Sequence, residues 1–205
     1  MSEDGQLQLL QAACRVIARR GVEGLRTRHV ADEAGVSTAL IHYHFGTRHE
    51  LVLAAFKLSD DEALAAVAAQ QDPDAPGRTQ LEQHLMAWTS DDPIIKQHWI
   101  VWTELWRWSL FEPEVRAAVA ERHGRFVAAI ADAIERGKAD GTIAKTVSTR
   151  DATERLAACS DSFGDQVVIG IRSVEEARHA LARALESECP SPAAGGGSGG
   201  TRRTR

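Results

Sequence analysis

The chain has 205 residues, of which 43% are hydrophobic and 26% charged, proportions that are ordinary for a globular protein. The net charge of -5 argues against a protein that binds nucleic acid along its whole length. The charge is uneven: residues 1–57 carry seven basic and six acidic side chains, whereas residues 58–205 carry 17 basic and 23 acidic ones. This asymmetry fits a protein of which only the N-terminal part approaches DNA.

The cysteines and the hydrophobic runs exclude two further classes of protein. Cys14, Cys159 and Cys189 share no spacing, which argues against a disulfide framework and against a CxxC metal site. The acidic N-terminus lacks a signal-peptide pattern, and no apolar run has the length of a membrane span. We therefore expect a cytoplasmic protein without a membrane partner.

Helix caps and helix breakers predict an all-α fold of about nine helices. Thr27 and Ser37 are expected N-caps, and Thr47 with Glu50 matches a capping box. The predicted helices cover residues 4–20, 27–34, 37–45, 47–70, 78–89, 93–110, 113–138, 148–169 and 173–188. We expect a helix-turn-helix domain over residues 1–50 and a second helical domain over residues 51–189. The Gly-, Ser- and Arg-rich residues 190–205 are predicted to be disordered, either as a solubilising tail or as an arm that touches DNA phosphates.

The stretch from Leu25 to Phe56 predicts two short helices joined by a tight turn at Gly35. Leu40, Ile41 and Phe45 are placed to anchor the second helix. The side chains then left to project outward are Thr38, Ala39, His42, Tyr43 and His44. Small and polar residues at the start of such a helix suit the major groove of DNA. The alternative is a helical hairpin with a solvated polar face.

At these residues the chain resembles the tetracycline-repressor (TetR) family of transcriptional regulators. The matching positions are Thr27, Val30, Ala31, Ala34, Gly35, Val36, Ser37, Ile41, His44, Phe45, Thr47, Arg48 and Leu51. The resemblance implies DNA contacts from Thr27, Arg28, Ser37, Thr38, Ala39, His42, Tyr43, His44, Thr47 and Arg48. The family usually has Tyr at His42 and Lys at Arg48, and we expect Arg48 to reach a phosphate. His42 and His44 lie about 200° apart on a helix, so we expect no metal site and no cofactor.

All five tryptophans lie within or close to one predicted helix, and they are Trp88, Trp99, Trp102, Trp106 and Trp108. They indicate either an aromatic core or a ligand cavity, and the resemblance implies a cavity in this part of the chain. The predicted lining is Trp88, His98, Trp99, Trp102, Glu104, Trp106, His123 and Asp161. Such a lining favours an aromatic or cationic small molecule. An aromatic cage with Glu104 would suit a quaternary ammonium ion.

The last two predicted helices carry apolar faces that include Leu156, Phe163, Val167, Val174, Ala177, Leu181 and Leu185. The resemblance implies a homodimer built on these helices, whereas the alternative is that they close the core of one chain. The implied function is a repressor that a small organic molecule releases from a palindromic operator. A transcriptional activator and a ligand-independent DNA-binding protein of the same fold remain alternatives. No nucleophile elbow, phosphate loop or dinucleotide motif indicates an enzyme.

Overall fold

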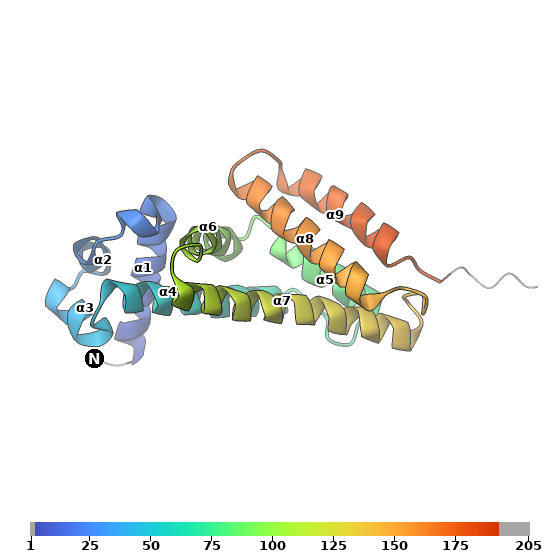
Figure 1. Ribbon diagram of the computed structural model, residues 1–205, viewed down its shortest axis with the longest axis horizontal. Helices are drawn as coiled ribbons and strands as arrows, with labels where there is room; N and C mark the ends of the chain where they lie inside the picture. Colours follow the sequence, from blue (N-terminus) through green and yellow to red (C-terminus); the bar gives the residue numbers. More distant parts are fainter. Residues whose placement is uncertain (1–2, 193–205) are drawn as a thin grey trace, which may run out of the picture.

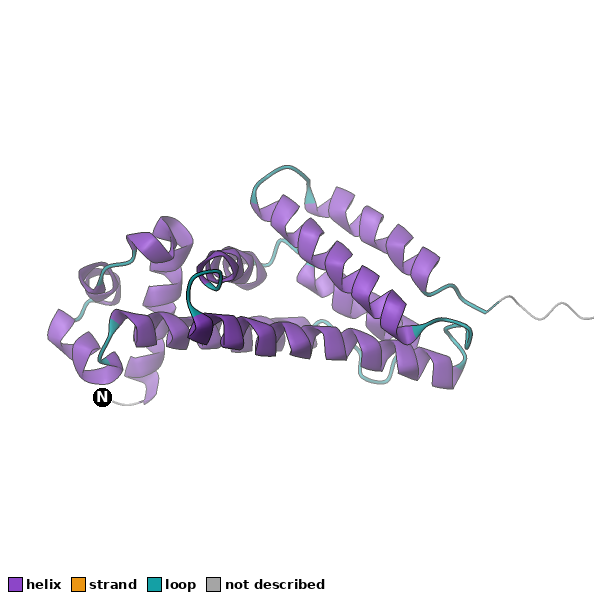
Figure 2. Cartoon of the chain, in the orientation of Figure 1, coloured by secondary structure: helices purple, strands orange, loops and turns teal. Residues whose placement is uncertain are grey.

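The computed structural model describes residues 3–192 and folds them into helices alone (Figure 2), as the sequence predicts. In chain order the helices are α1 (Glu3–Gly24), α2 (Thr27–Ala34), α3 (Thr38–Phe45), α4 (Arg48–Ala68), α5 (Gly77–Trp88), α6 (Pro93–Trp108), α7 (Pro113–Asp140), α8 (Thr149–Val168) and α9 (Val174–Glu188). Every predicted helix is present, with ends within a few residues of those expected. Most of the predicted tail, residues 193–205, lies outside the described residues.

The molecule is elongated, and its two ends are built from different helices (Figure 1). We call α1–α3 the head and α5–α9 the body. The long helices α4 and α7 run lengthwise, and α4 continues from the head into the body. Helix α6 lies between α1 of the head and α8 of the body, and it contacts both. Helix α6 therefore connects the head to the body through direct contacts.

The head follows the sequence pattern closely. Gly35 adopts the left-handed conformation (φ 67°) that lets α2 turn sharply into α3. Ser37 is the N-cap of α3, and its hydroxyl accepts a hydrogen bond from the Leu40 amide at 3.3 Å. Thr27 differs from its prediction: it is the first residue of α2, and Arg26 occupies the N-cap without a side-chain cap bond.

Helix α4 begins at the predicted capping box. Thr47 accepts a hydrogen bond from the Glu50 amide, and the Glu50 carboxylate accepts one from the Thr47 amide. The helix then continues without a break and is 21 residues long. The domain boundary expected after residue 50 therefore falls inside the first turn of a helix shared by head and body.

The body is an array of helices with defined N-terminal caps. Asp92 accepts hydrogen bonds from the Ile94 and Ile95 amides ahead of Pro93, and Ser148 and Ser173 cap α8 and α9. Glu112 occupies the N-cap of α7 without a side-chain cap bond. Within residues 3–192, no helix combines the length and the apolar character that crossing a membrane requires.

Candidate functional site

The outer face of α3 holds a compact group of exposed side chains. It consists of predicted DNA-contacting residues, namely Ser37, Thr38, Ala39, His42 and Tyr43. Tyr43 is 83% exposed, whereas Ile41 and Phe45 on the opposite face are buried and fix the helix to the head. One short helix thus offers hydroxyl, imidazole and phenol groups on a face that makes little contribution to the core.

Three flanking residues of the predicted set lie close to this face in the sequence. Arg28 is exposed at the start of α2, Thr27 is half-buried, and Thr47 is exposed but uses its hydroxyl in the capping box. Arg26, two residues before Arg28 and not among the predicted contacts, is also exposed. Its position directly before a predicted helix start is the signal that identifies it as a further phosphate-binding candidate.

Two predicted DNA contacts take different positions in the structure. The guanidinium of Arg48 donates to the carbonyl oxygens of Leu25 (3.0 Å) and Val22, so it closes the end of α1 instead of pointing outward. His44 is half-buried, and its Nε2 atom is buried without a hydrogen-bond partner among the described residues. Both side chains are therefore partly buried against the head, and their contact with a phosphate stays a prediction.

The tryptophans divide into a buried group and an exposed edge. Trp88, Trp99 and Trp102 are buried, whereas Trp106 is 49% exposed. The guanidinium carbon of Arg122 lies 4.9 Å from the ring centroid of Trp88, 4.4 Å from that of Trp102 and 5.5 Å from that of Phe126. The protein's own cation therefore fills the buried part of the aromatic cluster.

Arg122 is the centre of a buried polar network. Its Nε donates to Asp60 Oδ1 at 2.8 Å, and Arg125 donates to Asp60 Oδ2 at 2.7 Å. His98, predicted to line a ligand cavity, instead has its Nε2 3.0 Å from an Arg122 nitrogen. Burial, assisted by the nearby Arg122 charge, holds the pKa of His98 well below its usual range. His98 is accordingly neutral and accepts a hydrogen bond from Arg122.

The exposed edge of the cluster opens into a cavity of about 190 Å³, which we call the acidic cavity. It is lined by Trp102, Thr103, Trp106, Asp161, Ser162 and Asp165. The two indole rings lie 5.5 Å apart, centroid to centroid, at 51°. Asp161 Oδ1 is buried without a hydrogen-bond partner in the described part of the chain, and burial raises the pKa of this carboxyl group. Two carboxylates beside two indoles suit an organic cation.

Glu104, predicted to complete this cavity, faces the head instead. Its Oε2 accepts a hydrogen bond from the Val22 amide at 2.6 Å, beside the non-helical Gly21 (φ 68°) that interrupts α1. Three residues further on, Arg107 binds Glu23 at 3.1 Å. Helix α6 thus carries both the two indoles of the acidic cavity and the side chains that hold the end of α1.

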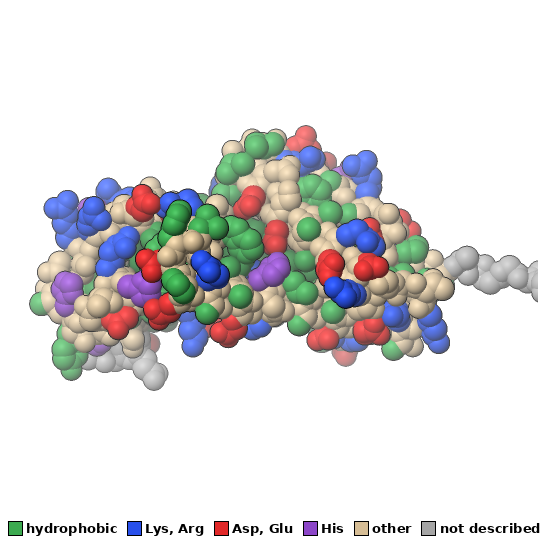
Figure 3. All heavy atoms as spheres, in the orientation of Figure 1, with side chains coloured by type: hydrophobic (Ala, Val, Ile, Leu, Met, Phe, Trp, Pro, Cys, Tyr) green, Lys and Arg blue, Asp and Glu red, His purple; other side chains and the backbone are tan. Residues whose placement is uncertain are grey.

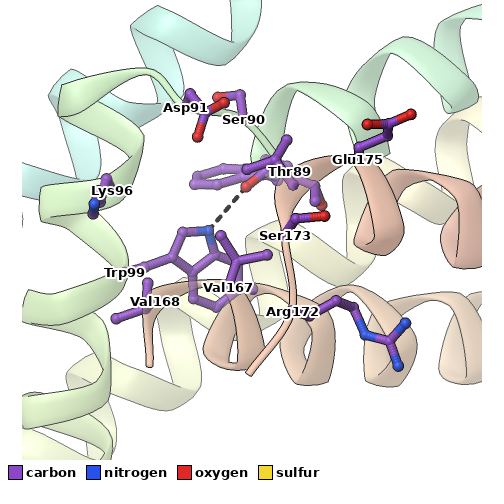
Figure 4. A pocket seen from close by; sticks show the side chains of 13 residues that line it. Thr89, Ser90, Asp91, Lys96, Trp99, Val167, Val168, Arg172, Ser173 and Glu175 are labelled. Atoms are coloured by element: carbon purple, nitrogen blue, oxygen red, sulfur yellow. Dashed lines mark hydrogen bonds between the residues drawn. The ribbon is translucent and has the colours of Figure 1, made fainter. Parts of the chain in front are cut away.

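A separate cavity of about 400 Å³ adjoins Trp88 and Trp99. Figure 4 shows Val167 and Val168 beside the Trp99 indole, whose N–H donates to the Trp88 carbonyl oxygen at 2.9 Å. The predicted ligand set is therefore distributed over different cavities. His123 belongs to a third one, which it shares with Trp106.

The residues predicted to form a dimer interface also divide into two groups. Those buried within a single chain are Leu156, Ala177, Leu181 and Leu185. They close the core of the monomer, which was the alternative interpretation, and they cannot also pair with a partner unless the helices separate. Those only partly buried are Phe163, Val167 and Val174, and the exposed Ile169 and Ile171 follow α8.

Comparisons with known proteins identify the family. Residues 9–55 match the model of the tetR family of bacterial regulatory proteins, and residues 76–190 match the C-terminal domain of BetI-type transcriptional repressors. The chain belongs to the TetR family. It is therefore a DNA-binding transcriptional regulator with an N-terminal helix-turn-helix, and not an enzyme.

Similar solved structures cover nearly the whole length of this chain. A TetR-family regulator from Rhodococcus sp. is 28% identical with a TM-score of 0.83, covering 91% of this chain and 99% of that one. A regulator from Saccharomonospora viridis, determined in complex with choline, is 28% identical with a TM-score of 0.84, covering 92% and 98%.

Curated relatives match over a short part of the chain. The regulator PksA from Bacillus subtilis is 38% identical over 60 residues, which are 29% of each chain. BetI from Brucella anthropi is 42% identical over 50 residues, or 24% of this chain and 26% of that one. These alignments span less than a third of the relatives' own length.

Proposed function

We propose that this regulator binds a near-palindromic operator as a homodimer and is released from it when a small organic cation enters the acidic cavity. The observation that carries the proposal is the placement of Trp102 and Trp106 on α6, the helix that also holds the end of α1 through Glu104. The BetI-type body favours repression over activation. A transcriptional activator and a ligand-independent DNA-binding protein of the same fold remain the alternatives.

On the DNA side, α3 is the proposed recognition helix. Its exposed residues Thr38, Ala39, His42 and Tyr43 suit the base edges of the major groove. The N-terminus of α3 at Ser37 offers backbone N–H groups to a phosphate, and Arg26 and Arg28 add positive charge beside it. The position of the uncharged groups at the helix start favours direct reading of bases there.

On the effector side, the charge of the acidic cavity favours a cation. Asp161 and Asp165 contribute two carboxylates, and among the described residues that line the cavity there is no Lys or Arg. The buried Oδ1 atom of Asp161 has no hydrogen-bond partner among the described residues, and an ammonium group in the cavity would add an attractive charge beside it. The choline complex of the similar Saccharomonospora viridis regulator supports a quaternary ammonium ion as the class of effector.

Coupling between the two sites follows from α6. A cation held by the indoles favours one position of α6, and Glu104 and Arg107 transmit that position to Val22 and Glu23 at the end of α1. The ligand changes DNA affinity only to the extent that it binds one head position better than another.

Dimerisation is proposed to use the outer surface of α8 and the turn that follows it. The apolar side chains there that one chain leaves at least partly exposed include Phe163, Val167, Ile169 and Ile171, and Val174 at the start of α9 adjoins them. A two-fold symmetric pair presents two α3 helices to two half-sites of a near-palindrome.

Gel-shift titration with the DNA upstream of the protein's own gene tests the proposal. We expect specific binding of the free protein and release by choline or tetramethylammonium, with quenching of tryptophan fluorescence. Asp161→Asn should bind the same DNA but lose release, whereas Phe111→Ala, an exposed aromatic change outside the acidic cavity, should behave as the wild type. Absence of specific DNA binding, or release that is equal in Asp161→Asn, would contradict the proposal.

A further inference from the structure

A second opening lies on the other side of Trp106 and has the opposite chemistry. This cavity of about 430 Å³, which we call the apolar cavity, is lined by Trp106, Ser109, Leu110, Arg116, Val119, Ala120 and His123. It is formed by the end of α6 and the first turns of α7. Among the described residues that line it there is no Asp or Glu, whereas the acidic cavity has two carboxylates.

The arginine that lines the apolar cavity, Arg116, is already hydrogen-bonded to the protein. Arg116 donates from Nε to the Ser109 carbonyl oxygen at 3.2 Å and from Nη2 to the Leu110 carbonyl oxygen at 3.3 Å. Its charge therefore serves the C-terminal end of α6, where helix carbonyls favour a cation. An anionic ligand gains little from this arginine, and the remaining wall favours an uncharged chain.

The two cavities meet at a pair of side chains. Trp106 lines both of them, and its ring centroid lies 6.1 Å from that of His123. The Nδ1 atom of His123 in turn lies 3.7 Å from Asp161 Oδ2. A ligand that passes along the Trp106 indole therefore goes directly from carboxylates to aliphatic side chains.

Large apolar side chains around the apolar cavity are exposed to solvent. Leu110 is 64% exposed and Phe111 is 73% exposed, next to the half-exposed Trp106. Figure 3 shows hydrophobic side chains gathered over the connection between α6 and α7, with acidic and histidine side chains beside them. Large apolar side chains that cluster in this way mark a surface that an apolar group covers.

We propose that the effector is an amphiphilic cation, an ammonium head joined to an alkyl chain. The head lies between the indoles of Trp102 and Trp106 and the carboxylate of Asp161. The alkyl chain crosses Trp106 and lies against Leu110, Val119 and Ala120 in the apolar cavity. This inference rests on the proposed function, because it takes the acidic cavity as the effector site and adds a second half to it.

A series of n-alkyltrimethylammonium ions, from tetramethylammonium to a chain of about ten carbons, tests the inference on the full-length protein. Each ion is titrated below its micelle-forming concentration, with tryptophan fluorescence and calorimetry as readouts. We expect the Kd to fall about three- to fourfold for each methylene that enters the apolar cavity, until the cavity is full. The n-alkyl sulfates of equal length should bind far more weakly.

Two variants test where the alkyl chain of the ligand lies. Leu110→Ala removes part of the apolar wall, and Ala120→Phe fills the space; both residues are exposed, so neither change should unfold the protein. Each should flatten the dependence on chain length while tetramethylammonium binds as to the wild type. Ile94→Ala, an exposed apolar change in the first turn of α6 and outside both cavities, is the matched control and should keep the full dependence.

The outcomes separate this inference from the proposed function. If tetramethylammonium or choline binds but longer chains add no affinity, the inference is overturned and the cation site stands. If affinity rises with length but Leu110→Ala and Ala120→Phe leave the rise unchanged, the chain lies elsewhere and the inference is again overturned. Equal binding of alkyl sulfates overturns it as well. If none of the cations binds, the proposed function itself fails.

Discussion

The head and the body form their proposed binding surfaces in opposite ways. In the head, the residues proposed to read DNA lie on the outer face of one eight-residue helix, and Ile41 and Phe45 hold that helix from behind. In the body, the proposed effector site combines side chains of α6 and α8, and Trp102 contacts both the cavity and the buried Arg122. Function and stability should therefore be separable in the head and linked in the body.

The largest expected effect of any single change is at the centre of the body. Asp60→Ala leaves the buried guanidinium of Arg122 without its carboxylate, in a place where Arg122 is only 4% exposed. We expect the free energy of unfolding to fall by about 3–5 kcal/mol. Urea denaturation measures the change. Asp61→Ala, at the exposed neighbouring position, is the control and should have little effect. A stable Asp60→Ala protein would mean that the network contributes little to the body.

The second effect concerns the packing of α6 against α8. A Cβ atom at Gly164 would lie 2.3 Å from Cζ2 of the Trp99 ring, so Gly164→Ala forces the buried indole to move. We expect a loss of roughly 1–3 kcal/mol and a changed fluorescence spectrum. At Gly124 in α7 a Cβ meets nothing within 4 Å, and Gly124→Ala should stabilise the helix by about 0.5–1 kcal/mol. Equal effects at both glycines would show that the contact with Trp99 does not constrain α8.

The same contrast explains which features are predictable from the sequence. The turn at Gly35, the Ser37 cap and the capping box of Thr47 and Glu50 involve residues no more than a few positions apart, so their patterns are visible in the sequence. The bond from Val22 to Glu104 joins residues 82 positions apart. Periodicity places Glu104 on α6 but does not say which neighbour it meets.

Arg122 was not singled out for a related reason. An arginine in a long polar helix is usually solvated, and only the fold shows that Asp60, 62 positions away, and three aromatic rings enclose it. The sequence places Trp99, Trp102, Trp106 and Trp108 on one helix, which is α6. It does not reveal that Arg122 fills the cage, or that Trp106 lines both an acidic opening and an apolar one. These features depend on how α6, α7 and α8 pack.

In the head, a single exposed side chain should change function without changing stability. Tyr43→Ala removes a phenol that is largely in solvent, so the free energy of unfolding should shift by no more than about 0.5 kcal/mol. Operator affinity should fall by roughly 1–3 kcal/mol, or about tenfold or more, if the side chain contacts the DNA. Fluorescence anisotropy with labelled operator measures the affinity, and effector affinity in the absence of DNA should be unchanged. Loss of stability in this variant would break the contrast between the two regions.

The smallest expected effect, a few-fold change in affinity with pH, tests whether Asp161 is the charge that binds the cation. Burial raises the pKa of Asp161, and the neighbouring Asp165 raises it further, whereas His123 on α7 and Arg122 oppose the shift. The carboxylate attracts the cation above this raised pKa and loses that attraction as the pH falls through it, so affinity for tetramethylammonium should decrease towards acidic pH. The measurement is made without DNA, so that it reports cation binding alone. Asp161→Asn should bind more weakly and show a flat profile, whereas Asp165→Asn should bind more weakly but keep the slope. A slope that persists in Asp161→Asn would show that another group carries the pH dependence and would contradict the assignment to Asp161.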